Sequence, residues 1–434
     1  MAQFNKNTHQ YLDQAKTLFE VVMLADQYGN RVGPANPTGV AVDAFGRARM
    51  STPLTLFDSS HRYKDNGLWS TANTANSTVT FSSNEGLINL TLTNGNANNE
   101  VVRETTKVMS YQPGKSLFIL NTMVMGEPKE NLRQRVGYFG ANNGIFLERS
   151  GNTISFVERS NVTGAVVDTP AVQSSWNYDK LDGTGPSQLT LDLTKAQIFW
   201  SDIEWLGVGS VRCGFVINGQ LIHCHSFHHA NYLDATYITT ASLPLRYEIK
   251  NVGAVSGGST LKQICSSVVT EGGYELRGDQ KSIGTPVQTA KTLTTAGTYY
   301  PMVSLQLKST NLDAIVILTA LSILGINSNP CSVGWRVIRG GTLASPSWTD
   351  VTDSSVQYDL SATGITGGTV LASGYIGITN QASQTIDVLK EALFKFQLQR
   401  NGLTSTPEPI TIAMSGSVNS ISGLASMDWE EVSR

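Results

Sequence analysis

The dipeptide Asn218-Gly219 lies between two runs of alternating apolar and polar residues, 211–217 and 220–227. Asn-Gly in this setting is the strongest short-range signal for a β-hairpin, because both residues of its two-residue loop need positive φ angles. A loop of this length also fixes which residues face one another across the two strands. The chain therefore contains at least one firmly specified antiparallel pair.

Short alternating runs recur along the chain, for example at 77–82, 86–93 and 134–139. Such alternation is typical of half-buried strands. Charged residues make up only 15% of the chain, and glycine occurs 40 times. This composition suits strands joined by tight turns and does not suit long surface helices. The sequence therefore predicts an all-β protein built from hairpins and sandwiches.

The length of 434 residues exceeds that of one ordinary domain. A link rich in glycine and proline, 33–39, belongs to an N-terminal arm that we place at residues 1–50. A polar, glycine-rich stretch, 271–285, marks a second boundary. We expect one β-sandwich over 51–275 and a second β-sandwich over 276–434.

The overall charge and the N-terminal residues exclude several classes of protein. The formal net charge is -3, so no basic field is present to hold phosphate backbones, and nucleic acid is not an expected partner. The first residues lack a basic segment followed by an apolar one, which argues against a secretory signal. The longest apolar stretch, 314–324, is too short to span a bilayer. We expect synthesis in a cytoplasm and no membrane anchor.

The four cysteines are Cys213, Cys224, Cys265 and Cys331, and no Cys-x-x-Cys pair occurs, which excludes a zinc ribbon by spacing. The hairpin register places Cys213 opposite Cys224. A disulfide between them is conceivable, although cross-strand bonds are often strained. Synthesis in a cytoplasm favours the alternative, two buried thiols.

Four of the six histidines cluster at 223–229. On a strand His223 and His225 point the same way, as a His-x-His metal pair does, and His228 or His229 could add a ligand. One such pair from each chain of a trimer could also meet on its axis. The competing interpretation is a set of ordinary surface or interface histidines, because Arg212 opposite His225 disfavours a cation. A transition metal at His223 and His225 is the only cofactor that the sequence suggests.

Asp202 and Glu204 are two residues apart on a predicted strand, between Trp200 and Trp205. Retaining glycosidases use a close pair of carboxylates. Lectin-like glucanases carry a third carboxylate two residues earlier, where this chain has Trp200. We therefore expect these four residues to contact a glycan or another surface, not to catalyse hydrolysis. The alternative is one tryptophan in the core beside an acidic outer face. No P-loop or His-Glu-x-x-His motif occurs, and we do not expect an enzyme.

Four segments also carry a family resemblance. They are VDAFGRARMSTPLTLFD (42–58), RQRVGYF (133–139), LDGTGPS (181–187) and AQIFWSDIEWLGVG (196–209). Together they resemble a family of virion structural proteins of tailed bacteriophages, cyanophages among them. The resemblance covers most of the chain and implies a tail-fibre, baseplate or head-surface component. It brings no catalytic residues to this sequence.

The resemblance implies that the middle sandwich is a concanavalin-like jelly roll of the lectin kind, which by itself does not establish sugar binding. It implies a homotrimer in the virion, assembled in the host cytoplasm. Residues 1–50 would dock to other virion proteins, and the outer domains would contact the host surface, including its glycans. Two alternatives stay open: a carbohydrate-binding or degenerate glycan-hydrolase module, and a capsid decoration protein that binds no host.

Overall fold

The structure is a computed structural model that describes residues 52–378 and 396–433, together with four short strands outside these ranges. The chain divides into two compact units, Met1–Thr52 and Pro53–Arg434. In the first unit three strands form a small antiparallel sheet. These strands are β1 (Phe4–Asn5), β2 (Gln10–Leu12) and β3 (Leu18–Glu20). The rest of the predicted arm, 1–50, lies outside the described residues.

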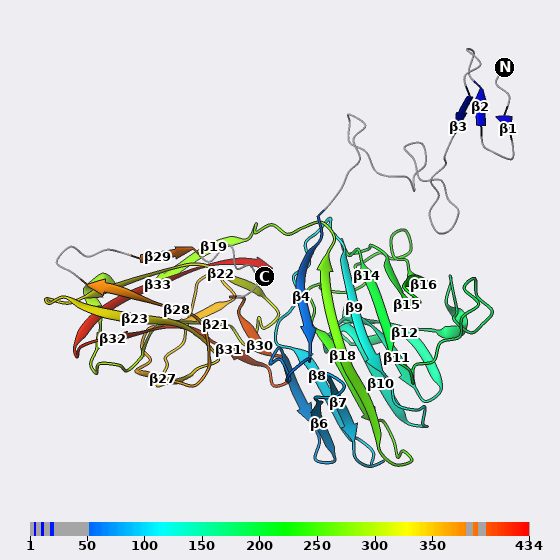
Figure 1. Ribbon diagram of the computed structural model, residues 1–434, viewed down its shortest axis with the longest axis horizontal. Coiled ribbons are helices and arrows are strands. Elements are labelled where there is room, and N and C mark those ends of the chain that lie inside the picture. The colour runs from blue at the N-terminus through cyan, green and yellow to red at the C-terminus, as the bar shows by residue number, and fades with distance from the viewer. Residues whose placement is uncertain are drawn as a thin grey trace. The chain divides into compact units, whose positions relative to one another are not determined.

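The second unit begins with a sandwich of two antiparallel sheets, shown in blue to green in Figure 1. The seven-stranded sheet has the order β13-β12-β11-β10-β17-β8-β5. Its strands are β5 (Trp69–Asn73), β8 (Glu100–Thr105), β10 (Leu132–Phe139), β11 (Gly144–Ser150), β12 (Thr153–Ser160), β13 (Val167–Val172) and β17 (Leu245–Asn251). A 3-10 helix, η1 (Gln173–Ser175), follows β13.

The facing eight-stranded sheet has the order β16-β15-β14-β9-β18-β7-β6, and β4 pairs with β18 as its eighth strand. Its strands are β4 (Leu54–Ser60), β6 (Ser77–Ser82), β7 (Leu87–Leu92), β9 (Leu117–Val124), β14 (Gln197–Ile203), β15 (Val211–Ile217), β16 (Gln220–Phe227) and β18 (Ser259–Thr270). Along β9 burial alternates strictly, and Leu117, Ile119 and Met123 point into the core between the sheets. This alternation is the one expected of strands covered on one side.

A second sandwich follows, drawn from green to red in Figure 1, and it has its own core around Leu305, Ile412 and Trp429. One sheet contains β19 (Asp279–Gly284), β20 (Lys291–Leu293), β22 (Ile315–Ile326), β29 (Thr385–Val388) and β33 (Ile421–Ser433). The other contains β21 (Tyr300–Leu307), β23 (Cys331–Arg339), β25 (Thr349–Asp350), β26 (Val356–Asp359), β28 (Thr369–Ile378) and β32 (Ile410–Gly416).

Two small pairs complete the second sandwich, β24 (Thr342–Ala344) with β27 (Gly364–Thr366), and β30 (Gln399–Asn401) with β31 (Thr406–Glu408). A 3-10 helix, η2 (Val287–Thr289), lies between β19 and β20.

The predicted fold class, all-β with a sandwich in the middle and a second one after it, is confirmed. The predicted boundary near residue 275 falls between β18 and β19, and as a domain boundary it stays a prediction.

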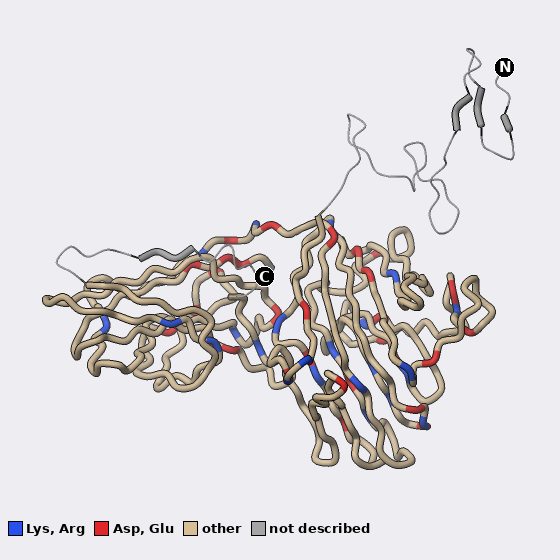
Figure 2. Tube along the Cα trace, in the orientation of Figure 1, with Lys and Arg blue, Asp and Glu red and all other residues tan. Residues whose placement is uncertain are grey.

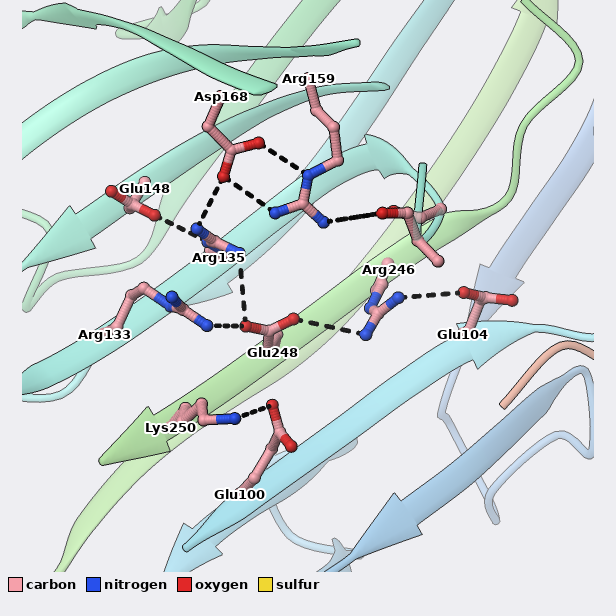
Figure 3. Close-up of polar contacts among 12 residues, drawn as sticks. Glu100, Glu104, Arg133, Arg135, Glu148, Arg159, Asp168, Arg246, Glu248 and Lys250 are labelled. Atoms are coloured by element: carbon pink, nitrogen blue, oxygen red, sulfur yellow. Dashed lines mark hydrogen bonds and ion pairs between the residues drawn. The ribbon is translucent and has the colours of Figure 1, made fainter. Parts of the chain in front are cut away.

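Charged side chains cover the outer face of the seven-stranded sheet. On β10 the core residues Leu132 and Val136 alternate with Arg133 and Arg135, so the arginines point away from the core. We call the ion pairs on this face the ion-pair ladder; eight of its residues form one connected network, and Lys250 and Glu100 form a separate pair (Figure 3). It contains five basic and five acidic residues: Glu100, Glu104, Arg133, Arg135, Glu148, Arg159, Asp168, Arg246, Glu248 and Lys250.

Glu248, whose side chain is 4% exposed, lies at the centre of the ladder. Its carboxylate is 2.9 Å from Arg133, 3.4 Å from Arg246 and 3.7 Å from Arg135. Burial alone would raise the pKa of Glu248, but these three guanidinium groups outweigh burial and lower it. The carboxylate is therefore ionised at neutral pH and balances the arginines around it.

The arginines of the ladder cover a small apolar cluster. It is formed by Phe139, Phe146 and Val157, which are all fully or almost fully buried. The guanidinium carbon of Arg135 lies 5.0 Å from the ring centre of Phe146, and that of Arg246 lies 5.5 Å from Phe139. Guanidinium groups over aromatic faces are favourable contacts. The ladder thus covers apolar surface that a solvent-facing sheet would otherwise expose.

We expect Glu248→Gln to lower the free energy of unfolding by about 3 to 5 kcal/mol, because it leaves buried guanidinium groups without their shared counter-ion. Urea denaturation followed by far-ultraviolet circular dichroism measures this loss. The matched control is Glu85→Gln, which removes an exposed partner of Lys262. Equal stability of the two variants would contradict a structural role for the ladder.

Candidate functional site

The β15–β16 hairpin forms as predicted, with Ile217 paired to Gln220 and with positive φ angles at Asn218 (53°) and Gly219 (78°). The predicted register is correct as far as the pair of Gly214 with His223. Beyond that pair a β-bulge at Cys224 shifts the strand, and Cys213 pairs with His225. A bulge places two residues opposite one and re-aims the side chains that follow it.

The expectation that Cys213 faces Cys224 is therefore wrong, because Cys224 is the extra residue of the bulge. Both cysteines are fully buried and free, which confirms the prediction of two buried thiols. Burial raises the pKa of each thiol, so both stay protonated at neutral pH. Neither has the thiolate character that metal ligation requires.

The bulge also separates the predicted metal pair. The ring of His223 stacks on Tyr178 with a centroid distance of 4.0 Å, whereas the ring of His225 packs edge-on against Phe227 at 4.6 Å. The expectation that His223 and His225 point the same way, as alternate residues of a regular strand do, is therefore wrong. The bulged residue Cys224 lies between them, and it has no partner on the neighbouring strand. Within the described ranges no group of three or more His, Cys, Asp or Glu could hold a metal ion. The metal site at His223 and His225 stays a prediction, which elemental analysis of the purified protein tests.

His229, suggested as a further ligand, holds a loop in place. Its Nε2 lies 2.7 Å from a carboxylate oxygen of Glu158, and its Nδ1 lies 2.6 Å from the carbonyl oxygen of Gly209. Its ring stacks on Tyr237 at 3.8 Å. Burial lowers the pKa of His229, but the hydrogen bond and charge of Glu158 outweigh burial and raise it. The remaining candidate, His228, lies 3.2 Å through its Nδ1 from Ser210 Oγ.

Asp202 and Glu204 lie on one face, as predicted, and Arg212 on the neighbouring strand bridges them. The Arg212 guanidinium pairs with Asp202, and it lies 2.7 Å from Glu204. The Asp202 side chain is 9% exposed and that of Glu204 is 53% exposed. Burial raises the pKa of Asp202 to about 6. The negative charges of Glu271 and Glu204 also raise this pKa, whereas the positive charge of Arg212 lowers it.

The two tryptophans occupy different environments. Trp205 packs edge-on against Tyr111 at 5.8 Å, and its indole N–H donates to the carbonyl oxygen of Ile238. This partly buried tryptophan anchors a loop to the core. Trp200 is 6% exposed and points to the outer side of the eight-stranded sheet, where its ring lies over Gly214. A Cβ atom at residue 214 would lie 2.8 Å from the indole, so glycine is needed there.

Four rings form a continuous band across the outer face of β9, β14 and β16. Phe118 lies 5.9 Å from Trp200, Trp200 lies 5.9 Å from His223, and His223 stacks on Tyr178. We call Phe118, Trp200, His223 and Tyr178 the aromatic strip. Tyr178 is its most accessible member, with 43% of its surface exposed. The strip is a row of ring faces of the kind that ligands with apolar surfaces contact.

The charged group lies directly beside the aromatic strip. Phe118 pairs across the strands with Asp202, and Asp202 pairs with Arg212. Two buried polar atoms here, Trp200 Nε1 and Asp202 Oδ1, have no hydrogen-bond partner among the described residues. Buried polar groups almost always have partners, so these two atoms depart from the usual pattern.

Sequence reasoning identified Trp200, Asp202, Glu204 and His223 but not the two outer members of the strip. Phe118 lies on a strand 82 positions before Trp200, and only the β9–β14 register brings them together. Tyr178 follows the 3-10 helix η1, and its backbone N–H donates to the carbonyl oxygen of Cys224 in the bulge. No local pattern predicts either contact.

The chain was compared with known families, curated proteins and solved structures. No protein-family model matches the chain, and no curated protein sequence matches it. Among solved structures, a Bacillus licheniformis β-glucanase is 14% identical with a TM-score of 0.32, and the match covers 49% of this chain and 96% of the glucanase. The Emp47p carbohydrate recognition domain is 11% identical with a TM-score of 0.33, over 52% and 98% of the two chains. Peanut lectin is 11% identical with a TM-score of 0.29, over 51% and 98%.

Lysine, arginine, aspartate and glutamate residues are interspersed along the chain trace of the second unit (Figure 2). In the described part of the chain, no helix has the length and apolar character needed to cross a membrane.

Acid should destabilise the middle sandwich through His223 and His225. Burial lowers the pKa of both to about 4, against about 6.5 for an unfolded histidine. Between these values the unfolded state binds more protons, so stability present above pH 6.5 is lost as pH falls toward 4. Urea denaturation at pH 7 and pH 4.5 measures the loss.

The double variant His223→Phe/His225→Phe keeps both rings but cannot be protonated, so its loss of stability on acidification should be smaller than that of the original chain. His229 has a raised pKa and acts in the opposite direction, but it is present in both proteins and cancels in the comparison. An unchanged pH dependence would show that these two rings are not the groups that titrate.

Proposed function

We propose that the middle sandwich is a non-catalytic carbohydrate-binding module whose ligand lies along the aromatic strip. The observation that carries the proposal is the band of four rings beside a group of planar polar side chains on one sheet face. Sugar rings present apolar C–H faces that pack on aromatic rings, and their hydroxyls pair with carboxylate and guanidinium groups. Structural likeness to glucanase and lectin sandwiches is compatible with this role.

The charged group favours binding over hydrolysis. In a glycosidase the two carboxyl groups flank the scissile bond, and the gap between them holds substrate or water. Here one guanidinium contacts both Asp202 and Glu204. A cation bound to both carboxylates occupies the place of the scissile bond and opposes the proton exchange that the acid and base would perform.

We expect Tyr178→Ala to weaken glycan binding by about 5- to 150-fold, because loss of a ring that stacks on a ligand costs on the order of 1 to 3 kcal/mol. A glycan array identifies a ligand, and calorimetric titration compares the variants. Tyr375→Ala, which removes an 86% exposed tyrosine of the second sandwich, is the matched control. Equal effects of the two variants, or no binding of any glycan by the original chain, would refute the site.

We propose a tailed-phage virion as the setting for this module. The sequence resemblance supports it, and by that resemblance residues 1–50 would dock on other virion proteins. A homotrimer would present three copies of the strip to a host surface. Imaging of particles that carry a labelled copy of this protein should find it on the tail, baseplate or head surface. Absence from purified particles would refute the setting and leave glycan binding untouched.

A further inference from the structure

A cavity of about 420 Å³ opens in the second sandwich, between β20 of one sheet and the β25–β26 pair of the other. Thr285, Pro286 and Thr289, around the 3-10 helix η2, form one wall of this cavity. Residues of β25 and β26 and of the segments beside them form the opposite wall. The volume lies within the range of small-molecule sites in proteins.

Hydrogen bonds within the protein hold both walls of the cavity. The backbone N–H of Thr285 donates to the carbonyl oxygen of Ala425, and the N–H of Ala425 donates back to Thr285 Oγ1, each at 2.9 Å. On the opposite wall the N–H of Ser347 donates to Asp359 Oδ1 at 2.8 Å, and β25 pairs with β26. The cavity is therefore preformed, which lowers the cost of ordering it around a ligand.

Lys291 is the one charged residue among the described residues that line the cavity, and the protein itself satisfies its ammonium group. This group donates to the carbonyl oxygens of Pro301, Leu360 and Ala362. An ammonium group has three N–H donors, so none is left for a ligand anion. Burial lowers the pKa of Lys291, whereas the negative charge of Asp359, itself 1% exposed, raises it. The cation thus has a buried counter-charge within the protein.

Three side-chain hydroxyls that line the cavity, those of Ser347, Thr349 and Tyr358, have no hydrogen-bond partner among the described residues. Each of them can both donate and accept a hydrogen bond. Tyr358 and Leu360 pack partly against the core of the second sandwich and add apolar surface to the lining. The cavity therefore combines available hydroxyls with one aromatic ring and offers no unpaired charge from its described lining.

We propose that this cavity binds an uncharged, hydroxyl-rich ligand, a neutral sugar unit, and so is a second glycan site of the chain. The hydroxyls of a sugar donate and accept, as the three hydroxyls of the lining do. Its C–H faces pack on apolar and aromatic side chains, here Leu360 and Tyr358. The site goes beyond the proposed function, because it lies in the second sandwich and does not involve the aromatic strip.

The test uses the full chain carrying Tyr178→Ala and three probes, the neutral trisaccharides of glucose, galactose and mannose. The background substitution weakens binding at the aromatic strip, so the binding that remains reports the cavity. Calorimetric titration should detect binding of at least one probe. Adding Ser347→Ala and Thr349→Val should weaken that binding by about 5- to 150-fold, because two hydrogen bonds to the ligand are lost.

The two substitutions leave the wall of the cavity in place, because Ser347 is bound to Asp359 through its backbone N–H and valine keeps the branched shape of threonine. The matched control is Thr369→Val/Ser373→Ala, which removes the same two groups from exposed positions of β28. This control should bind the probe as tightly as the background chain. Circular dichroism verifies that each variant is folded.

The outcomes separate this inference from the proposed function. If no trisaccharide binds the Tyr178→Ala chain, or if the Ser347/Thr349 variant binds as tightly as the β28 control, the inference falls. Neither result bears on the aromatic strip, which is tested by the effect of Tyr178→Ala on the original chain. Binding that Tyr178→Ala leaves unchanged and the Ser347/Thr349 variant loses would support the cavity and overturn the strip.

Discussion

Charge balance on the seven-stranded sheet is the constraint on which much of the second unit depends. Each charge of the ladder is partly or wholly removed from water, a cost that is offset only when every group has an opposite neighbour. The carboxylate of Glu248 is the opposite charge beside three arginines at once, Arg133, Arg135 and Arg246. Because those arginines also cover Phe139 and Phe146, the ladder and the apolar cluster beneath it stabilise each other.

The ladder also continues into the second sandwich. Glu104, at one end of the ladder, pairs with Arg400 at 2.7 Å, and both side chains are 4% exposed. Arg400 in turn lies 3.1 Å from Asp313 and donates to the carbonyl oxygen of Thr105. The contact between the sandwiches is therefore polar and directional at this point, so it fixes orientation more than it supplies apolar burial.

The fold class was predictable because its signals are local. The Asn218-Gly219 loop and the alternating runs each specify a strand or a turn within a few residues. The site was predictable only in part. Asp202 and Glu204 share a face by strand geometry alone, but the bulge at Cys224, which redirects His225, leaves no mark in the sequence pattern. Partners such as Phe118 for Trp200 depend on strand order, which a single sequence does not contain.

The strand order has a consequence for how this chain is made. Among the described strands β4 pairs with β18 alone. The segment Leu54–Ser60 therefore cannot form its strand pair until about two hundred further residues have been synthesised. In the second sandwich, β33 pairs with β19, β20 and β22, all synthesised earlier. Each sandwich thus closes with its last long strand, and non-local pairing of this kind folds slowly. During translation, unpaired early strands would be exposed to neighbouring nascent chains, so crowding on polysomes and access to chaperones would limit the yield of folded protein.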